Sequence, residues 1–314
     1  MRVVALLGPT AGGKTELAAE LAVRLGGEVV SVDSRQVYRR LDIGTAKPDA
    51  ATRARVPHHL LDLVEPDEPF DAATYARLGR SAIAAMADRG RPVVLCGGSG
   101  LYFRVLTEGL FAGPPPDPEV RRELDAELER AGAIAMHAEL RRVDPRAAER
   151  IAPRDAVRIR RALEVVRQTG RPISEWQEGH GFTDRPYEVL VFVLSPAVAE
   201  LDRRISDRAA AMWRRGLVEE TRQVLAAGFD GSCKPLAAIG YREAQEHLRG
   251  TLAPDEAIAA ITLATRRYAK RQRTWFRRIE GARWLTGREP VDALVAASAE
   301  FLASAAATRE DSRA

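Results

Sequence analysis

The sequence has few cysteines and no long apolar run. Its 314 residues include only Cys96 and Cys233 as cysteines, too few for a disulfide framework or a zinc module. The longest apolar run, residues 189–194, has the length of a strand and falls far short of a membrane span. The N-terminal residues lack the form of a signal peptide, because a short apolar run leads directly into a glycine-rich loop. We therefore expect a cytoplasmic protein that works in a reducing environment away from membranes.

Lysine is also scarce. Only four of the 48 basic residues are lysine, namely Lys14, Lys47, Lys234 and Lys270, and the rest are arginine. A bias of this strength indicates genomic composition, so a single arginine says little about function. A retained lysine says more, because an ammonium and a guanidinium are not interchangeable. The net charge of +4 permits an acidic partner without requiring one.

A phosphate-binding motif follows the first predicted strand. It fits the pattern G-x-x-x-x-G-K-[ST] and consists of Gly8, Pro9, Thr10, Ala11, Gly12, Gly13, Lys14 and Thr15. The apolar residues 3–7 before it predict a buried strand, and residues 16–25 after it have the spacing of a helix. Backbone N–H groups and the helix N-terminus would bind an anion, Lys14 would reach the outer phosphate and the Thr15 hydroxyl would ligate Mg²⁺. A glycine-rich turn without a ligand is the alternative, and the strand–loop–helix context argues against it.

Residues 28–32 predict a second strand, and Asp33 follows it directly. In open parallel sheets the chemistry is found at the carboxyl ends of the strands, so Asp33 is expected near the phosphate loop. An N-cap is the other common role for an aspartate at this place. The polar residues Ser34, Arg35 and Gln36 that follow favour a functional role.

The third predicted strand, residues 91–96, ends in a second glycine-rich loop, residues 97–102, without an acidic residue. ATPases and GTPases usually place their Mg²⁺-binding aspartate at such a position, so its absence argues against a motor or switch protein. The paired histidines His58 and His59 have no Cys or Glu cluster nearby, and we expect them to have structural roles.

A small helical domain is expected between two parts of the core. A proline-rich segment, residues 113–118, reads as a stiff linker, and helical spacing follows at 119–131, 133–143, 145–151 and 155–168. Residues 189–194 then suit a strand buried on both faces. The sequence thus predicts an α/β fold, a P-loop NTPase-like parallel sheet flanked by helices, in residues 1–112 and 187–285, with an all-helical insert at 113–186. We expect residues 303–314 to be a disordered tail.

Two later helices carry basic residues on one face. Arg204 and Arg208 lie one turn apart in the helix at 201–213, where an anion could bind between them. The helix at 257–278 aligns Arg266, Lys270, Arg273 and Arg277 on one face, and Tyr268, Trp275 and Phe276 alternate with them. A basic face with aromatics is typical of RNA binding, whereas a surface helix with its aromatics in the core is the alternative.

Together these motifs resemble the tRNA dimethylallyltransferases, also called tRNA isopentenyltransferases. The matching stretches run in order from Gly8 to Arg278 and read GPTAGGKT, DSRQVYRRLDIGTAKP, PHHLLD, GGSGLYFR, VRIRRALEV, IGYRE and KRQRTWFRR. Gly12 stands where serine is common in the family, and Ser99 stands where threonine is usual. No C-terminal zinc finger of the eukaryotic type is present, so the bacterial form is expected.

The resemblance implies transfer of the dimethylallyl group of dimethylallyl diphosphate to the N6 amine of the adenosine on the 3′ side of a tRNA anticodon. Asp33 would be the general base, with Ser99 near the base and Arg208 facing the diphosphate, and the target base would flip out of the stack. Mg²⁺ is the implied cofactor. The helical insert would clasp the anticodon stem, and a monomer is expected. The implied tRNA contacts are Asp33, Ser34, Arg35, Gln36, Ser99, Arg121, Val157, Arg158, Ile159, Arg160, Arg161, Ile239, Gly240, Tyr241, Arg242, Lys270 and Arg273.

Two other functions fit the phosphate loop. A nucleoside or small-molecule kinase could use Asp33 as its base and would turn over ATP without needing the basic helix at 257–278. A non-catalytic RNA-binding NTPase would retain its function without Asp33.

Overall fold

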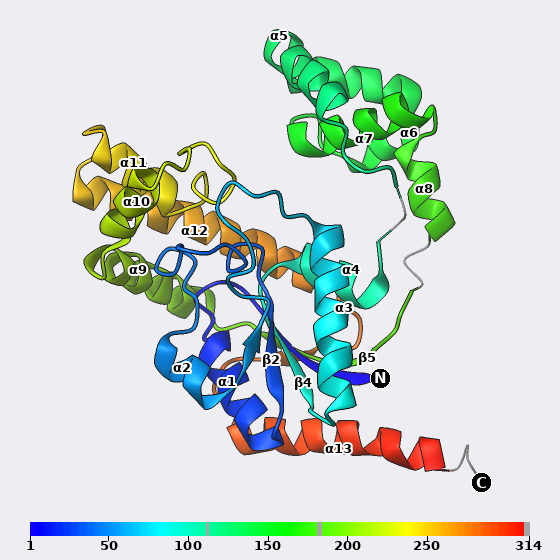
Figure 1. The fold of residues 1–314 in the computed structure, drawn as a ribbon, viewed down its shortest axis with the longest axis vertical. Coiled ribbons are helices and arrows are strands. Elements are labelled where there is room, and N and C mark those ends of the chain that lie inside the picture. Colours follow the sequence, from blue (N-terminus) through cyan, green and yellow to red (C-terminus); the bar gives the residue numbers. More distant parts are fainter. Residues whose placement is uncertain (111–112, 181–183, 311–314) are drawn as a thin grey trace. The chain divides into compact units, whose positions relative to one another are not determined.

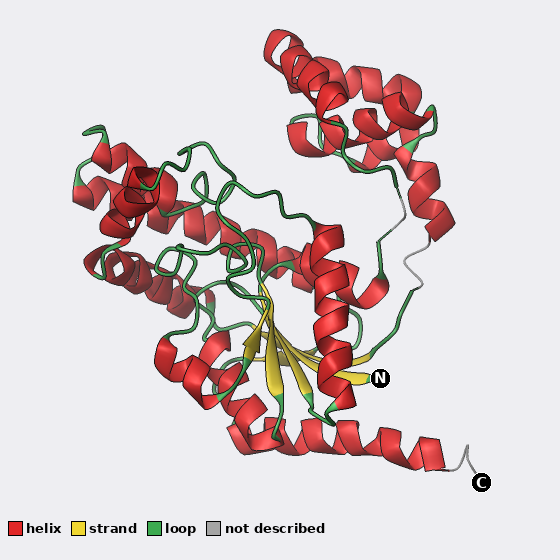
Figure 2. Ribbon diagram, viewed as in Figure 1, coloured by secondary structure: helices red, strands yellow, loops and turns green. Residues whose placement is uncertain are grey.

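A six-stranded, fully parallel sheet forms the centre of the computed structural model (Figures 1 and 2), which describes residues 1–110, 113–180 and 184–310. The strand order is β3-β2-β4-β1-β5-β6. The strands are β1 (Arg2–Leu7), β2 (Glu28–Val32), β3 (His58–His59), β4 (Val93–Gly97), β5 (Glu188–Leu194) and β6 (Arg283–Leu285). This architecture confirms the predicted α/β fold class.

The register of the central strands places their carboxyl ends at one edge of the sheet. Leu7 at the end of β1 pairs with Gly97 of β4 and with Val193 of β5, and Val32 of β2 also pairs with Gly97. The side chains of residues 3–7 are fully buried, since helices cover both faces of β1. The segments after β1, β2 and β4 therefore start side by side, which brings the phosphate loop, Asp33 and the second glycine loop together.

Helices cover both faces of the sheet. On one face α1 (Lys14–Leu25) and α13 (Val291–Glu310) form a core with Val4 and Leu6 of β1. On the other side (Figure 1), α3 (Ala72–Asp88) contacts the sheet, and its Tyr75 hydroxyl donates to the Ser31 carbonyl oxygen at 2.9 Å. The other helices of this unit are α2 (Ala50–Arg55), α4 (Gly100–Glu108), α9 (Val198–Arg214), α10 (Leu217–Ala226), α11 (Tyr241–Leu248) and α12 (Pro254–Phe276).

The chain divides into two compact units, one of Met1–Thr107 with Pro186–Ala314 and one of Glu108–Arg185. The second unit contains α5 (Pro118–Val143), α6 (Pro145–Arg150), α7 (Ala156–Thr169) and α8 (Ile173–His180). Gly132 breaks α5 with a φ of 78°, at the point where two helices were predicted to meet. The core of the second unit joins α5, α6 and α7 through Leu140, Ala147 and Leu163. Residue 112, where the first predicted core segment ends, lies outside the described residues.

Residues 303–310, part of the tail for which disorder is predicted, belong to α13 in this structure. Three consecutive alanines, 305–307, favour the helix, because alanine has the highest helix propensity. Residues 311–314 lie outside the described part of the chain. Within the described ranges, no helix is both long enough and apolar enough to cross a membrane.

Candidate active site

The phosphate loop joins β1 to α1 in a conformation that leaves backbone N–H groups free for an anion. Gly13 has a φ of 91° and precedes α1 without a side-chain cap, so the helix N-terminus is open to a ligand. A Cβ on Gly8 would lie 2.6 Å from the Leu194 carbonyl oxygen, so this position requires glycine. The Gly12 N–H donates to the Pro9 carbonyl oxygen at 3.1 Å and closes the turn.

Lys14 lies inside this loop. Its Nζ donates to the Pro9 carbonyl oxygen at 2.7 Å. Burial lowers the pKa of Lys14 to about 8, and the nearby Arg208 acts in the same direction, whereas Asp33 opposes it. An anion bound in the loop would stabilise the charged ammonium and reverse this shift.

Asp33 follows β2 and lies within electrostatic reach of Lys14. Burial raises the pKa of Asp33, although the Arg35 N–H donates to its Oδ1 at 2.8 Å and the charge of Lys14 favours the carboxylate. A buried carboxylate with a raised pKa is a stronger base than an exposed one. Asp33 therefore has the surroundings that a general base needs.

Ser99 lies beside Asp33 because the second glycine loop leaves β4 next to the end of β2. The Ser99 Oγ accepts a hydrogen bond from the Ser34 N–H at 3.1 Å, and the Ser99 N–H donates to the Val32 carbonyl oxygen. The Tyr268 hydroxyl of α12 also interacts with the Ser99 side chain, and burial raises the pKa of Tyr268 to about 12. The two glycine-rich loops and Asp33 thus form one continuous site.

The two arginines of α9 have different surroundings. Arg204 donates to the Gly12 carbonyl oxygen at 3.3 Å and pairs with Glu200 on its own helix. Burial lowers the pKa of Arg208 although the charge of Asp33 opposes this shift, and the charge of Arg208 in turn lowers the pKa of Lys14. Among the described residues no hydrogen bond engages the Arg208 guanidinium, so Arg208 is the better placed of the two to bind an anion.

Arg35 and Gln36 fix neighbouring loops. Arg35 donates to the Lys234 carbonyl oxygen at 2.8 Å, and the Lys234 ammonium donates to the Phe70 carbonyl oxygen. The Gln36 amide accepts from the Ser31 hydroxyl and donates to the Ala46 carbonyl oxygen at 3.1 Å. In this structure both side chains serve to position the loops around the site.

Lys47, another of the rare lysines, has a structural environment. Its ammonium is buried and donates to the Tyr38 carbonyl oxygen at 2.6 Å, to Asp42 at 2.7 Å and to Asp62 at 2.5 Å. The paired histidines are structural as predicted, since His59 contacts Glu28 at 2.6 Å and His58 contacts the Val56 carbonyl oxygen.

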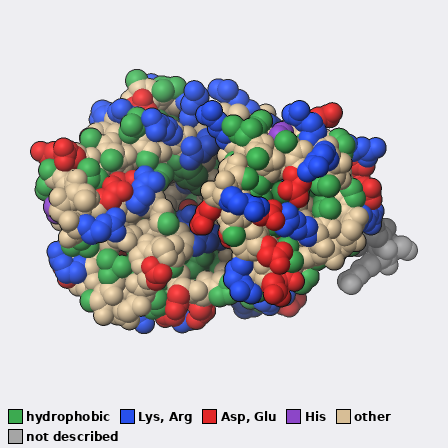
Figure 3. Space-filling model, turned by 90° about the horizontal axis from the view of Figure 1, so that it is seen from above, with side chains coloured by type: hydrophobic (Ala, Val, Ile, Leu, Met, Phe, Trp, Pro, Cys, Tyr) green, Lys and Arg blue, Asp and Glu red, His purple; other side chains and the backbone are tan. Residues whose placement is uncertain are grey.

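The basic face of α12 is accessible, but its aromatic residues point inward. Arg266, Lys270 and Arg277 are exposed and Arg273 is half-buried, whereas Phe276 is buried. The alternative of aromatics in the core is therefore right for Phe276. Lys and Arg side chains are spread over the face drawn in Figure 3, and acidic side chains lie among them.

All four cationic residues expected to contact tRNA in the helical unit are paired with acidic side chains, Arg158 with Asp155 at 3.5 Å. Val157 is 70% exposed and Arg158 is exposed beside it at the start of α7. Arg121 and Arg161 both pair with the buried Glu164, and Arg160 pairs with Asp125 at 2.5 Å. Ile159, which lies within the stretch expected to contact tRNA, is 0% exposed, so its side chain belongs to the core of this unit.

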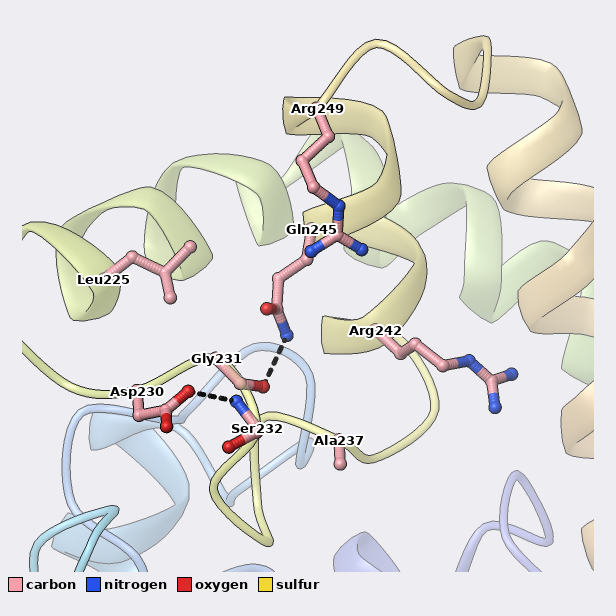
Figure 4. Close-up of a pocket in the computed structure, with 8 residues that line it drawn as sticks. All are labelled: Leu225, Asp230, Gly231, Ser232, Ala237, Arg242, Gln245 and Arg249. Atoms are coloured by element: carbon pink, nitrogen blue, oxygen red, sulfur yellow. Dashed lines mark hydrogen bonds between the residues drawn. The ribbon is translucent and has the colours of Figure 1, made fainter. Parts of the chain in front are cut away.

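The stretch 239–242, also expected to contact tRNA, contains both buried and exposed residues. Gly240 has a φ of 97° and precedes α11, and Ile239 is half-buried before it. Tyr241 is 1% exposed, donates to Glu220 at 2.6 Å and accepts from the Gly44 N–H, so it fixes a loop and does not face a ligand. Arg242 is exposed and lines a shallow pocket with Arg249 and Gln245 (Figure 4).

Replacing Tyr241 with phenylalanine is expected to reduce stability and leave tRNA affinity unchanged. The variant loses the bond to Glu220 and leaves the Gly44 N–H with one partner fewer, at a cost of about 1–3 kcal/mol in the free energy of unfolding. Urea denaturation and tRNA binding by the folded variant test this. A large loss of tRNA affinity at wild-type stability would contradict the structural role.

The residues at the phosphate loop suit Mg²⁺. Thr15 lies in the first turn of α1 with an exposed side chain, and its hydroxyl oxygen is the kind of ligand that Mg²⁺ prefers. No group of three His, Cys, Asp or Glu side chains that could hold a metal occurs in the described part of the chain.

Comparisons with known proteins identify the family. The family model described as IPP transferase matches residues 36–279. A tRNA dimethylallyltransferase of Anaeromyxobacter dehalogenans is 52% identical over 91% of this chain and 95% of its own length. The full-length tRNA isopentenylpyrophosphate transferase of Bacillus halodurans superposes with a TM-score of 0.70, at 37% identity over 96% of both chains. A eukaryotic dimethylallyltransferase acting on tRNA superposes with a TM-score of 0.72, at 27% identity over 88% of this chain and 69% of that chain. The chain therefore belongs to the IPP transferase family, and within it to the tRNA dimethylallyltransferases.

Proposed function

We propose that this enzyme transfers the dimethylallyl group of dimethylallyl diphosphate to the N6 amine of the tRNA adenosine on the 3′ side of the anticodon, at the edge of the sheet where β1, β2 and β4 end. One observation carries the assignment of the site. The register of β1, β2 and β4 brings Lys14 and Asp33 to one edge of the sheet, where the charges of Asp33 and Arg208 both act on the Lys14 ammonium. Two cations beside a base are what a displacement of diphosphate by an amine requires.

The diphosphate is the group that the cations bind. The open N-terminus of α1 supplies N–H donors, and Lys14 and Arg208 supply positive charge beside it. Charge on the departing diphosphate increases as its bond to carbon breaks, so these contacts strengthen in the transition state. Mg²⁺ held at the Thr15 hydroxyl, when bound, would neutralise part of the same charge.

The chemical step replaces the C1–O bond with a C1–N6 bond and transfers one proton. The N6 nitrogen attacks C1 of the dimethylallyl group, and the electron pair of the C1–O bond leaves with the diphosphate oxygen. An adenine amine is a poor nucleophile because its lone pair is delocalised into the ring, and it becomes acidic as it bonds to carbon. Asp33 takes the released N6 proton, and its raised pKa makes it suited to do so.

The tRNA must deliver its base to a site beside the phosphate loop, so the adenosine has to leave its stack. The exposed cations of α12, the exposed Val157 and Arg158 of the helical unit and Arg242 of α11 are the surfaces we assign to the RNA. We further propose that the enzyme works as a cytoplasmic monomer, where its tRNA substrate is available.

One assay tests the proposed reaction. The purified protein is incubated with Mg²⁺, dimethylallyl diphosphate labelled in its prenyl group and unmodified tRNA. Label is expected in the RNA, on the adenosine beside the anticodon, together with free diphosphate. Diphosphate release without labelled RNA would contradict the proposal.

Replacing Lys270 and Arg273 together with alanine is expected to weaken tRNA binding and to flatten its salt dependence. Each phosphate contact that is lost reduces the slope of log K against log salt by about 0.7–0.9. Arg24→Ala with Arg91→Ala removes the same charge from the opposite edge of the sheet and should leave the slope unchanged. If the slope of log K against log salt were equal for the two double variants, α12 would not contact the RNA.

A further inference from the structure

Gln272, a buried polar residue of α12, has no role in the reaction steps described above. Its side chain is buried, with 7% of the residue exposed, although the neighbouring Lys270 and Arg271 face solvent. The Gln272 Oε1 accepts a hydrogen bond from the Thr10 N–H at 2.9 Å, and its Nε2 donates to the Gly98 carbonyl oxygen at 2.8 Å. One amide therefore bridges the phosphate loop and the second glycine loop.

These two loops contact different reactants in the proposed reaction. The phosphate loop contains Lys14 and binds the diphosphate, and the loop after β4 contains Ser99, which contacts Ser34 beside Asp33. The ladder between β1 and β4 aligns the strands only as far as Leu7 and Gly97. Beyond those residues the Gln272 amide is a direct connection that sets the distance between the loops.

The packing of α12 against the second loop allows little adjustment. A Cβ on Gly98 would lie 2.3 Å from the Gln272 Nε2, and a Cβ on Gly100 would lie 2.3 Å from the Trp275 ring. Gly98 and Gly100 are therefore required by the side chains of α12. The helix that presents cations to solvent uses its inner face to hold the active site together.

We propose that Gln272 is a positioning residue for prenyl transfer, which fixes the diphosphate and the acceptor base relative to each other. This role rests on the proposed function, because it presumes that the two loops hold the two substrates. Loss of the amide leaves the Thr10 N–H and the Gly98 carbonyl oxygen without this partner and releases the loops from each other. A misplacement of reacting atoms by 1 Å is worth on the order of 10²-fold in rate.

The Gln272→Met variant keeps the length of the side chain and removes both hydrogen bonds. With saturating prenyl donor and tRNA, its single-turnover transfer rate is expected to fall by about 10²-fold, while the affinities for inorganic diphosphate and tRNA change little. Thr262→Ala removes a buried hydroxyl of α12 that bonds only its own helix, and the rate should remain at the wild-type level. A wild-type rate for folded Gln272→Met would overturn the proposal, whereas a wild-type enzyme that fails to label tRNA would instead overturn the proposed function.

The second test pairs Gln272 with Gly98. Gly98 does not have a positive φ, so alanine can adopt its backbone conformation and the added methyl acts mainly by displacing the Gln272 amide. Gly98→Ala is expected to slow transfer in the wild type and to have little further effect in Gln272→Ala, where the space is free. Independent, additive losses in this double-mutant cycle would show that the two residues do not act through one contact.

Discussion

The Asp33→Asn variant is expected to transfer the prenyl group about 10²–10⁴-fold more slowly than the wild type, because it lacks the base that takes the N6 proton. The amide oxygen of asparagine can still accept the hydrogen bond that Asp33 Oδ1 receives from the Arg35 N–H, so the loop after β2 should keep its conformation. Binding of tRNA and of diphosphate should persist. Single-turnover transfer with labelled prenyl donor, together with tRNA binding, measures both effects.

The pH dependence distinguishes a base from a residue that only holds the loop. Because burial raises the pKa of Asp33, the wild-type rate should fall on the acid side at a higher pH than for an ordinary aspartate. Asp33→Asn should lose this acid limb along with most of its rate. Asp67→Asn, a change at an exposed carboxylate of the same unit, should alter neither the acid limb of the pH profile nor the transfer rate. A wild-type single-turnover rate in Asp33→Asn would exclude Asp33 as the base.

The sequence was sufficient to predict the part of the site that depends on local rules. Strand, glycine loop and helix follow one another along the chain, so the conformation around Lys14 could be inferred from a short stretch. Asp33 could be placed near it because parallel strands end at a common edge, and the observed register of β1, β2 and β4 has that consequence. The fold class followed from the same alternation of strands and helices.

The roles of single residues within a motif could not be predicted in this way. A resemblance assigns a whole stretch to tRNA, but the fold decides which side chains reach the surface. Ile159 and Tyr241 lie in such stretches and are buried, and Arg161 pairs with Glu164. The two-residue β3 and the three-residue β6 are too short to give a periodic signal.

Gln272 and Glu220 were missed for another reason, which is that their partners are backbone groups far away in the sequence. The Glu220 carboxylate accepts from the N–H groups of Asp42, Ile43 and Gly44, and Gln272 bridges Thr10 and Gly98. Backbone groups are the same in every sequence, so a pattern of side chains along the chain cannot predict contacts to them. A polar residue within the inward-facing positions of α12 was the only available signal.

The Lys14→Met variant is expected to lose about 10²–10³-fold in transfer rate, since it removes a preorganised positive charge from the departing diphosphate. Its pH dependence provides the sharper test. In the free enzyme burial lowers the pKa of Lys14 to about 8, and a bound diphosphate favours the ammonium and so raises that pKa. Diphosphate affinity should therefore fall as the pH rises above about 8, and binding should take up a proton there.

Comparison of the wild type with Lys14→Met isolates the effect of this lysine, because diphosphate and the other cations of the site titrate equally in the two proteins. Calorimetry in buffers of different ionisation enthalpy should detect proton uptake on diphosphate binding at pH 9 by the wild type and none attributable to this residue in the variant. Arginine at this position should restore little, since a planar guanidinium cannot reproduce the compact ammonium that bonds the Pro9 carbonyl oxygen. If the wild type and Lys14→Met lost affinity in parallel above pH 8, the diphosphate would not contact Lys14, and the cation that stabilises the leaving group would have to be Arg208 alone.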